Sequence, residues 1–238
     1  MRRFFTAVLL LAPLSAFAAA PCKYQAPRNM QINLAGVKAV QIEVHSHNLH
    51  LIANNAAQKL IVTGHACTSD NAVLNSLQVS QKLAGDQLLI DIGADSQAPS
   101  NIFGSSYAYL DINMQLPARM PVTLGVGSGN ATVNGVQQLQ SHVNSGDLHV
   151  RHVAGKYTAS LGAGDIDAND IGSLELTSVG SGDVKIEGIK GDAKIGSIGS
   201  GDVMLRKVGG SFSLGAMGSG DVIHARVKGK LSLPRDDD

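Results

Sequence analysis

The second half of the chain repeats a short motif at a nearly constant spacing. A glycine followed by Asp or Asn recurs six times, usually after a serine, and successive glycines lie 17 to 19 residues apart. The pairs are Gly129-Asn130, Gly146-Asp147, Gly164-Asp165, Gly182-Asp183, Gly201-Asp202 and Gly220-Asp221. A fixed period near 20 residues is typical of solenoids, in which each repeat buries its apolar side chains against its neighbours.

Each repeat predicts two short strands and two tight turns. In residues 182–200, Val184 and Ile186 alternate with Asp183, Lys185 and Glu187, and the same alternation returns after a Lys-Gly turn. Period-two alternation of β-branched residues between glycines indicates strands. Neither strand can bury its apolar side alone, so we expect parallel stacking of coils of about 18 residues at a spacing of ~4.8 Å.

Aligning the repeats predicts inward columns that are almost wholly aliphatic. The three columns are Ala131, Leu148, Ile166, Val184, Val203, Val222; then Val133, Val150, Ala168, Ile186, Leu205, His224; then Val136, Val153, Ile171, Ile189, Val208, Val227. The repeat glycines are expected to adopt positive φ where the coil turns. His224 interrupts its column, which favours a partly open last coil over a buried histidine ligand. Aromatic residues make up 4% of the chain, in keeping with an interior that leaves little room for rings.

The N-terminal half also predicts strands, with less even spacing. Period-two runs occupy residues 37–44, 48–51, 60–63, 77–79, 88–92 and 109–116, whereas 70–80 is ambiguous between helix and strand. Residues 21–35 and 96–107 read as a polar lead-in and a polar loop. We therefore divide the chain into an irregular β-rich part or cap (21–121), a regular β-helix (122–234) and an acidic tail (235–238).

Residues 1–20 have the pattern of a secretory signal peptide. Arg2 and Arg3 precede an apolar run, and Ala16-Phe17-Ala18 or Ala18-Ala19-Ala20 supplies small residues for cleavage. Export to the periplasm, the cell surface or the medium is expected. No later stretch reaches the ~20 apolar residues of a membrane-spanning helix, so the mature chain is expected to be soluble or peripheral.

The two cysteines, Cys22 and Cys67, lie outside the repeat. An oxidising compartment favours a disulfide between them. Lipid attachment at Cys22 is the alternative, but Pro21 and Ala19 depart from the usual lipoprotein pattern.

Charge is nearly balanced over the chain. There are 19 basic and 19 acidic side chains, and removal of the leader with its two arginines leaves 17 and 19. Nucleic-acid binding would need a basic face, which this balance does not predict.

The Gly-Ser-Gly-Asp repeat and the early segment IEVHSHNLHLI (residues 42–52) resemble bacterial "putative adhesin" families of unknown function, among them the auto-transporter adhesin head GIN domain. The resemblance covers residues 37–233. It implies a single-stranded β-helix, right-handed, in exported or surface proteins, and it carries no catalytic residues over to this chain.

Two groups of side chains could bind a cation. The acidic column (Asn130, Asp147, Asp165, Asp183, Asp202, Asp221) is expected to accept backbone N–H groups within its own turns; calcium binding in a β-roll is the alternative. His45 and His47, two apart, are expected to share one strand face, and His50 and His149 to share an outward column separated by Thr132. We interpret these histidines as surface residues and assign neither a metal nor a cofactor.

The sequence favours a non-enzymatic binding or adhesion surface in the cell envelope. Its ligand could be an envelope component, a glycan or a protein, met by the outward column Thr132, His149, Asp167, Lys185, Met204, Ile223. A carbohydrate-active enzyme is the alternative, with Asp165 and Asp167 as its carboxylates, but no Gly-x-Ser-x-Gly elbow or phosphate-binding loop occurs. The sequence does not determine the oligomeric state.

Overall fold

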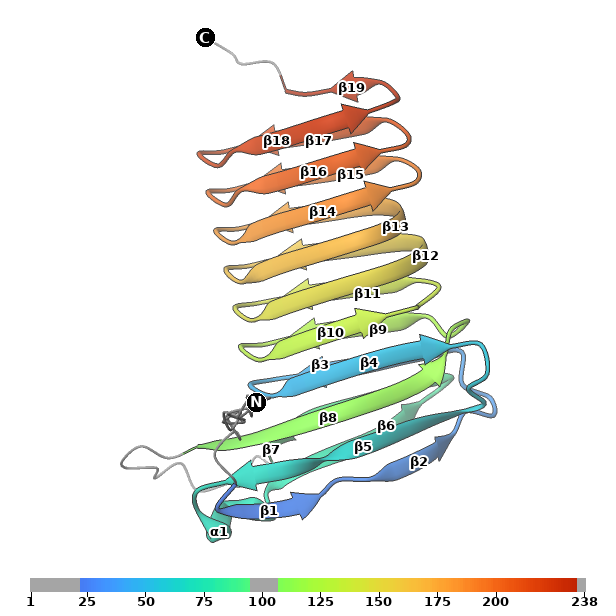
Figure 1. The fold of residues 1–238 in the computed structure, drawn as a ribbon, viewed down its shortest axis with the longest axis vertical. Helices are drawn as coiled ribbons and strands as arrows, with labels where there is room; N and C mark the ends of the chain where they lie inside the picture. Colours follow the sequence, from blue (N-terminus) through green and yellow to red (C-terminus); the bar gives the residue numbers. More distant parts are fainter. Residues whose placement is uncertain (1–21, 95–106, 235–238) are drawn as a thin grey trace, which may run out of the picture.

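The computed structural model describes residues 22–94 and 107–234. The predicted leader, the tail and all of the predicted loop 96–107 except Tyr107 lie outside these residues. The described chain is a β-solenoid, as the repeat predicts. Its coils stack along one axis and leave the C-terminal coil at one end (Figure 1).

Each coil contributes one strand to each of two opposite sheet faces. Face A consists of parallel strands in the spatial order β8 (Ala108–Pro117), β4 (Asn48–Asn54), β10 (Asn130–Asn134), the first half of β12 (Asp147–Leu161), the first half of β13 (Asp165–Val179), β14 (Asp183–Ile189), β16 (Val203–Val208) and β18 (Val222–Val227). Face B consists of β7 (Gln87–Ala94), β3 (Ala39–Val44), β9 (Val122–Val126), β11 (Leu139–Val143), the second halves of β12 and β13, β15 (Ala193–Ile198), β17 (Phe212–Met217) and β19 (Leu231–Ser232).

The predicted inward columns form the core between the two faces. Leu148, Ile166, Val184 and Val203 pair in register from coil to coil, and each is at most 1% exposed. Alternation explains this register, because a slip by one residue would move every aliphatic side chain to the solvent side.

Two rings enter this interior, for which the sequence predicted little room. Tyr157 and Phe212 are fully buried on face B. The Tyr157 hydroxyl satisfies its polar end by a 3.0 Å hydrogen bond with Ser141 Oγ on the neighbouring coil. Burial raises the pKa of Tyr157, so the phenol stays protonated.

The repeat glycines are required by close backbone approach and not by positive φ, which corrects the prediction. The glycines with φ between 65° and 86° lie elsewhere, at Gly36, Gly85, Gly135 and Gly188. A Cβ added at Gly182 would lie 1.8 Å from Gly164 O in the coil below, and one added at Gly201 would lie 2.0 Å from Gly182 O. Only glycine lets successive turns stack this closely.

Positive φ occurs instead at the opposite corner, where the chain leaves face A. Non-glycine residues in the left-handed region are His152, Asp170, Lys207 and Arg226, with φ of 56–60°. They stack with Gly135 and Gly188, and we call this turn the left-handed corner. One left-handed residue per coil bends the strand before the apolar residue of the third column, so the chain rounds the corner with its core side chain still inside.

The order of coils in space differs from their order in the sequence. Strands β3 and β4 pair on one side with β7 and β8 and on the other with β9 and β10. The early coil is thus inserted between two coils that come later in the chain. The division at residue 121 stays a prediction; the core runs continuously across that position.

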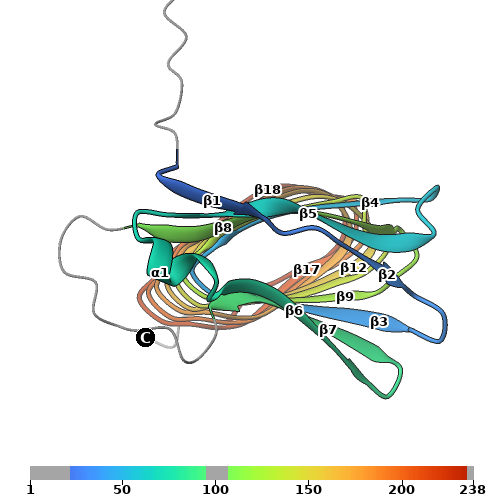
Figure 2. The ribbon, with the colours of Figure 1, turned by 90° about the horizontal axis from the view of Figure 1, so that it is seen from below.

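Antiparallel strands cover the N-terminal end of the stack. Strand β5 (Lys59–Thr68) pairs antiparallel with β8, and β6 (Leu77–Ala84) pairs antiparallel with β7, so both outer edges of the first coil are occupied. Seen from below, β5 and β6 lie on opposite long sides of the oval coil (Figure 2). The short helix α1 (Asn71–Leu74) occupies part of the region that the sequence left ambiguous.

The predicted lead-in is also partly regular. Residues 21–35 contain β1 (Tyr24–Pro27) and β2 (Met30–Asn33), which pair antiparallel with β5. The prediction missed them because each strand is only four residues long and β1 ends in Pro27, a residue that is tolerated in an edge strand. A disulfide joins Cys22 to Cys67 and fastens the start of β1 to β5.

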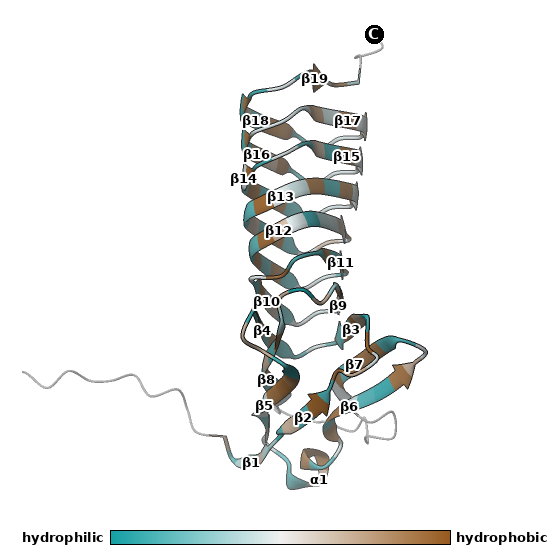
Figure 3. Cartoon of the chain, turned by 90° about the vertical axis from the view of Figure 1, so that its right-hand side faces the viewer, coloured by the Kyte–Doolittle hydropathy of each residue, from teal (hydrophilic) through white to brown (hydrophobic). Residues whose placement is uncertain are grey.

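The C-terminal end of the solenoid is less well covered. Val222 and Val227 are only partly buried, whereas Val203 and Val208 in the coil below are 0–1% exposed. His224 is half-buried with its ring 5.8 Å from that of Phe212, as the expectation of a partly open last coil requires. Figure 3 shows this end as bare stacked coils, while the β6–β7 hairpin projects beside the other end.

Candidate functional site

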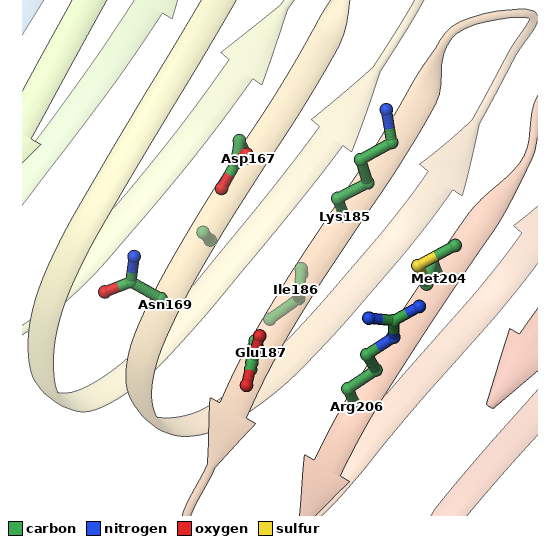
Figure 4. Close-up of a pocket in the computed structure, with 8 residues that line it drawn as sticks. Asp167, Asn169, Lys185, Ile186, Glu187, Met204 and Arg206 are labelled. Carbon is green, nitrogen blue, oxygen red and sulfur yellow. The ribbon is translucent and has the colours of Figure 1, made fainter. Parts of the chain in front are cut away.

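Face A carries two outward columns of side chains along its upper coils. The first is the predicted column, in which Asp167, Lys185 and Met204 lie in register on β13, β14 and β16. The second contains Asn169, Glu187 and Arg206 on the same strands. Figure 4 shows both columns pointing to the same side, around a shallow depression of about 230 Å³. Sequence reasoning missed the second column, although the same period-two alternation assigns it to the outer side.

The charges on this face are partly paired. Glu187 Oε1 lies 2.6 Å from Lys207 Nζ, and this ammonium, assisted by Arg206 and Arg226, lowers the pKa of the Glu187 carboxyl. The Arg206 guanidinium is exposed beside the half-buried Met204 side chain. The depression therefore offers two cations, an amide, an apolar thioether and two carboxylates on a rigid support.

A second polar patch lies lower on face A, where the early coil meets the regular repeat. Thr132 pairs in register with His50 on one side and His149 on the other, as predicted. His50 Nδ1 lies 3.0 Å from Thr132 Oγ1, and His50 Nε2 lies 3.6 Å from Asp111 Oδ1. Arg151 and Asn134 line the same hollow of about 440 Å³.

The acidic column lies at the corner where each coil enters face A, and its members are exposed except for the half-buried Asp183. Asp165 Oδ1 accepts the Asp183 N–H at 3.2 Å, and Asp202 Oδ1 accepts the Asp221 N–H at 3.0 Å. Each of these bonds reaches the next coil, whereas the sequence predicted bonds within the same turn. The difference arises because coils stack so closely here that the nearest free donor belongs to the neighbour. These carboxylates thus help to hold coil to coil.

His45 and His47 do not share a face, contrary to prediction, because both lie in the turn between β3 and β4. His45 is exposed, with Nε2 3.1 Å from Asp91 Oδ2. His47 is buried and its Nδ1 accepts the Leu110 N–H at 3.3 Å. Burial, with a smaller contribution from His45, lowers the pKa of His47. Across residues 22–94 and 107–234, no three His, Cys, Asp or Glu side chains cluster as metal ligands would.

None of the helices in the described residues has the length and apolarity needed to span a membrane.

Comparison with known proteins identifies one family. A family model described as Toastrack DUF4097 matches residues 37–233 of this chain. A search of curated proteins finds no match.

Comparison with solved structures finds similarity to three bacterial proteins among others. A putative adhesin from Bacteroides fragilis is 13% identical, with 90% of this chain and 99% of that chain covered and a TM-score of 0.48. A putative cell adhesion protein from Clostridium sporogenes is 11% identical, with 88% and 99% covered and a TM-score of 0.43. A putative adhesin from Parabacteroides distasonis is 12% identical, with 85% and 97% covered and a TM-score of 0.41.

Proposed function

This chain belongs to the Toastrack DUF4097 family, and from its geometry we propose that it is an exported, non-enzymatic β-solenoid that presents a binding or adhesion surface in the bacterial cell envelope. The observation that carries the proposal is the pair of exposed, in-register columns on face A. Because each supporting strand pairs with a coil above and below, the side chains are held at fixed spacing before a ligand arrives. Such preorganisation reduces the entropic cost of binding.

The chemistry of face A supports recognition more than catalysis. The lowered pKa of Glu187 keeps that carboxylate ionised at neutral pH, whereas a general acid needs a raised pKa. Asp165, one of the two carboxylates considered for an enzyme, is engaged by the Asp183 N–H. Cations and carboxylates that neutralise one another beside an apolar group form a typical mixed recognition surface.

Two features support export. The first 20 residues have the composition of a signal peptide. The Cys22–Cys67 disulfide closes the cap of the solenoid, and such bonds persist in oxidising compartments.

Binding can be tested with purified protein lacking residues 1–20, presented to envelope vesicles and to arrayed envelope glycans. We expect saturable binding that falls at least about tenfold when Asp167, Lys185 and Arg206 are replaced by serine together, the loss expected from removing charge-assisted contacts. Replacement of Gln140 and Lys194 by serine on face B is the control and should leave binding unchanged. Binding that survives the face A variant, or fails in every assay, would contradict the proposal.

Export can be tested separately by expressing the full chain in a bacterium and fractionating the cells. We expect a processed form whose N-terminal sequence begins just after Ala18 or Ala20. An unprocessed chain that stays in the cytosol would rule out the exported role.

A further inference from the structure

We propose that the left-handed corner of the last three coils is a binding site for an acidic polysaccharide. This site lies beside the outward columns of face A and shares with them the ion pair between Lys207 and Glu187, but it does not rest on the proposed function. The corner holds a hollow of about 650 Å³ whose rim carries Lys190, Lys207, Arg226 and Lys228.

The stacking of the corner brings these four cations together. Lys190, Gly209 and Lys228 occupy equivalent positions, since each donates its backbone N–H to the coil below, to Ile171 O, Ile189 O and Val208 O at 2.7–3.0 Å. Lys207 and Arg226 form a second column, because both are the left-handed residue of their coil. The two columns lie side by side, and the column of Lys190 and Lys228 is held by backbone hydrogen bonds to the coil below.

Gly209 opens the hollow between Lys190 and Lys228. A side chain at this position would place its Cβ 2.2 Å from Lys190 O, so the site can hold no larger residue. The buried residues Ile189 and Val208 contribute the floor. An extended ligand could therefore lie close to the backbone, with ammonium groups on both sides.

Among residues 22–94 and 107–234, the ion pairs of the corner become fewer toward the C-terminal end, so that more cations than carboxylates face the hollow there. Lys190 Nζ pairs with Asp170 Oδ1 at 2.8 Å in the coil below, and Lys207 pairs in the same way with Glu187. Arg226 and Lys228 lie one coil further up. In the coil below them, the positions equivalent to Glu187 and Asp170 are occupied by Arg206 and Lys207, which are cations and cannot pair with them. Within residues 22–94 and 107–234, Arg226 and Lys228 form no ion pair, and four cations face two carboxylates.

The spacing of the cations selects a ligand that carries several negative charges. Lys190 and Lys228 are two coils apart, which corresponds to roughly 10 Å at the usual distance between paired strands. One phosphate or carboxylate cannot bridge that distance, whereas a polymer with an anionic group on successive units can. Arg and Lys clusters of this kind are typical of sites for acidic glycans such as heparin.

Other polyanions fit the corner less well. Single-stranded nucleic acid is held by aromatic side chains on which bases stack, and no aromatic residue lines this hollow. A membrane surface requires protruding apolar side chains beside the cations. The exposed large apolar residues of the upper coils, Met217, Ile223, Leu231 and Leu233, do not line it either.

The test uses polygalacturonate as the probe, with neutral dextran, a single-stranded oligonucleotide and phosphatidylglycerol vesicles as comparisons. Binding to the purified protein lacking residues 1–20 is measured by calorimetry at several salt concentrations. We expect polygalacturonate to bind in preference to the other three, and binding to weaken as salt rises because the contacts are ionic.

Paired variants locate the site. Replacement of Arg226 and Lys228 by glutamine should weaken polygalacturonate binding at least about tenfold and flatten its salt dependence, as expected when two charge contacts are lost. Replacement of the exposed Lys59 and Lys82 by glutamine removes the same charge at the other end of the molecule and should have no effect. Replacement of Asp167 and Lys185 alone by serine on face A, which keeps Arg206 beside Lys207, should leave polygalacturonate binding unchanged, so failure of the two proposals can be told apart.

Three outcomes would overturn the inference: no polygalacturonate binding, equal loss in the Lys59 and Lys82 control, or preferential binding of the oligonucleotide or vesicles. Thermal melting of each variant verifies that the fold is intact. Because Arg226 and Lys228 are exposed, their replacement should leave the melting temperature close to that of the parent protein.

Discussion

Single residues in this protein are constrained mainly by the distance between neighbouring coils. At the corner that carries the acidic column, the backbones of neighbouring coils approach so closely that a methyl group cannot fit on the repeat glycines. At the left-handed corner, by contrast, Lys207 and Arg226 adopt φ near 60° and keep their full side chains. The effect of replacing a glycine on the stability of the fold should therefore differ strongly from one turn to another.

Substitution of a repeat glycine should be far more harmful than substitution of a turn glycine with positive φ. For Gly182→Ala we expect a loss of more than about 2 kcal/mol in the free energy of unfolding, because the new Cβ would overlap Gly164 O. Gly36→Ala is the control. Gly36 has φ of 80° but open space around it, so only the backbone strain of about 1 kcal/mol applies.

Urea unfolding followed by circular dichroism measures both variants. A smaller loss for Gly182→Ala than for Gly36→Ala would show that the coils separate easily at this corner, and would contradict the close stacking described above.

Buried His47 should make stability depend on pH in the mildly acidic range. Burial lowers its pKa in the folded protein below the ordinary value of 6.5, so the unfolded chain binds the proton more readily. The stability that depends on the neutral ring is complete above about pH 6.5 and is lost as the pH falls toward the lower folded-state pKa. The surface carboxylates whose pKa is lowered by cations, such as Asp170 and Glu175, change charge only at lower pH, below 3.8 and 4.5 respectively.

The measurement is the melting temperature between pH 8 and pH 5 for the parent protein and for His47→Gln, which keeps an acceptor for the Leu110 N–H. We expect the parent curve to fall more steeply over this range than the variant curve. If the two curves of melting temperature against pH run parallel, groups other than His47 cause the pH dependence.

Among the elements, the N-terminal cap depends on contacts that are distant in sequence. Strands β1 and β2 are only four residues long and lie on β5, which in turn closes the edge of β8. An edge strand covered in this way cannot pair with another chain, which protects this end of the stack from aggregation.

Loss of the disulfide should loosen the cap. The bond closes a loop with a sequence separation of 45, for which chain entropy predicts a contribution of about 4 kcal/mol. We therefore expect Cys22→Ser/Cys67→Ser to melt at a lower temperature than the parent protein. Proteolysis should then cut first in β1 and β2, and peptide mapping can locate the cut. An unchanged melting temperature would mean that β1 holds to β5 without the bond.

At the scale of the whole molecule, one end is capped and the other ends in partly exposed coils. Solenoid stability is a sum of coils and of interfaces between neighbouring coils, so a last coil with a single interface should open most readily. We expect amide hydrogen exchange to become faster from β14 through β16 to β18. Mass spectrometry of peptides from these strands can measure this gradient, and equal protection in β18 and β14 would mean that the last coil is covered in solution.

Much of the regular half could be predicted from the residues because its signals are local. Alternation with period two admits only one register for Leu148, Ile166, Val184 and Val203, since any other would expose them. The first outward column of face A follows from the same alternation. The signals were weaker for β1 and β2, because an alternation over only four residues does not distinguish a strand from a loop.

The sequence by itself determined the solenoid, its inward columns and the position of its corners, because each repeat states the same pattern and only stacking satisfies it. The tertiary structure alone decided that the β3–β4 coil lies between two later coils, because one aliphatic coil can stack on many others and local sequence does not rank them. It also decided that the glycines serve close approach. It also brought together at one hollow the four cations Lys190, Lys207, Arg226 and Lys228. The close approach of the glycines and the meeting of these cations both depend on contacts between neighbouring coils, which are about 18 residues apart in the chain.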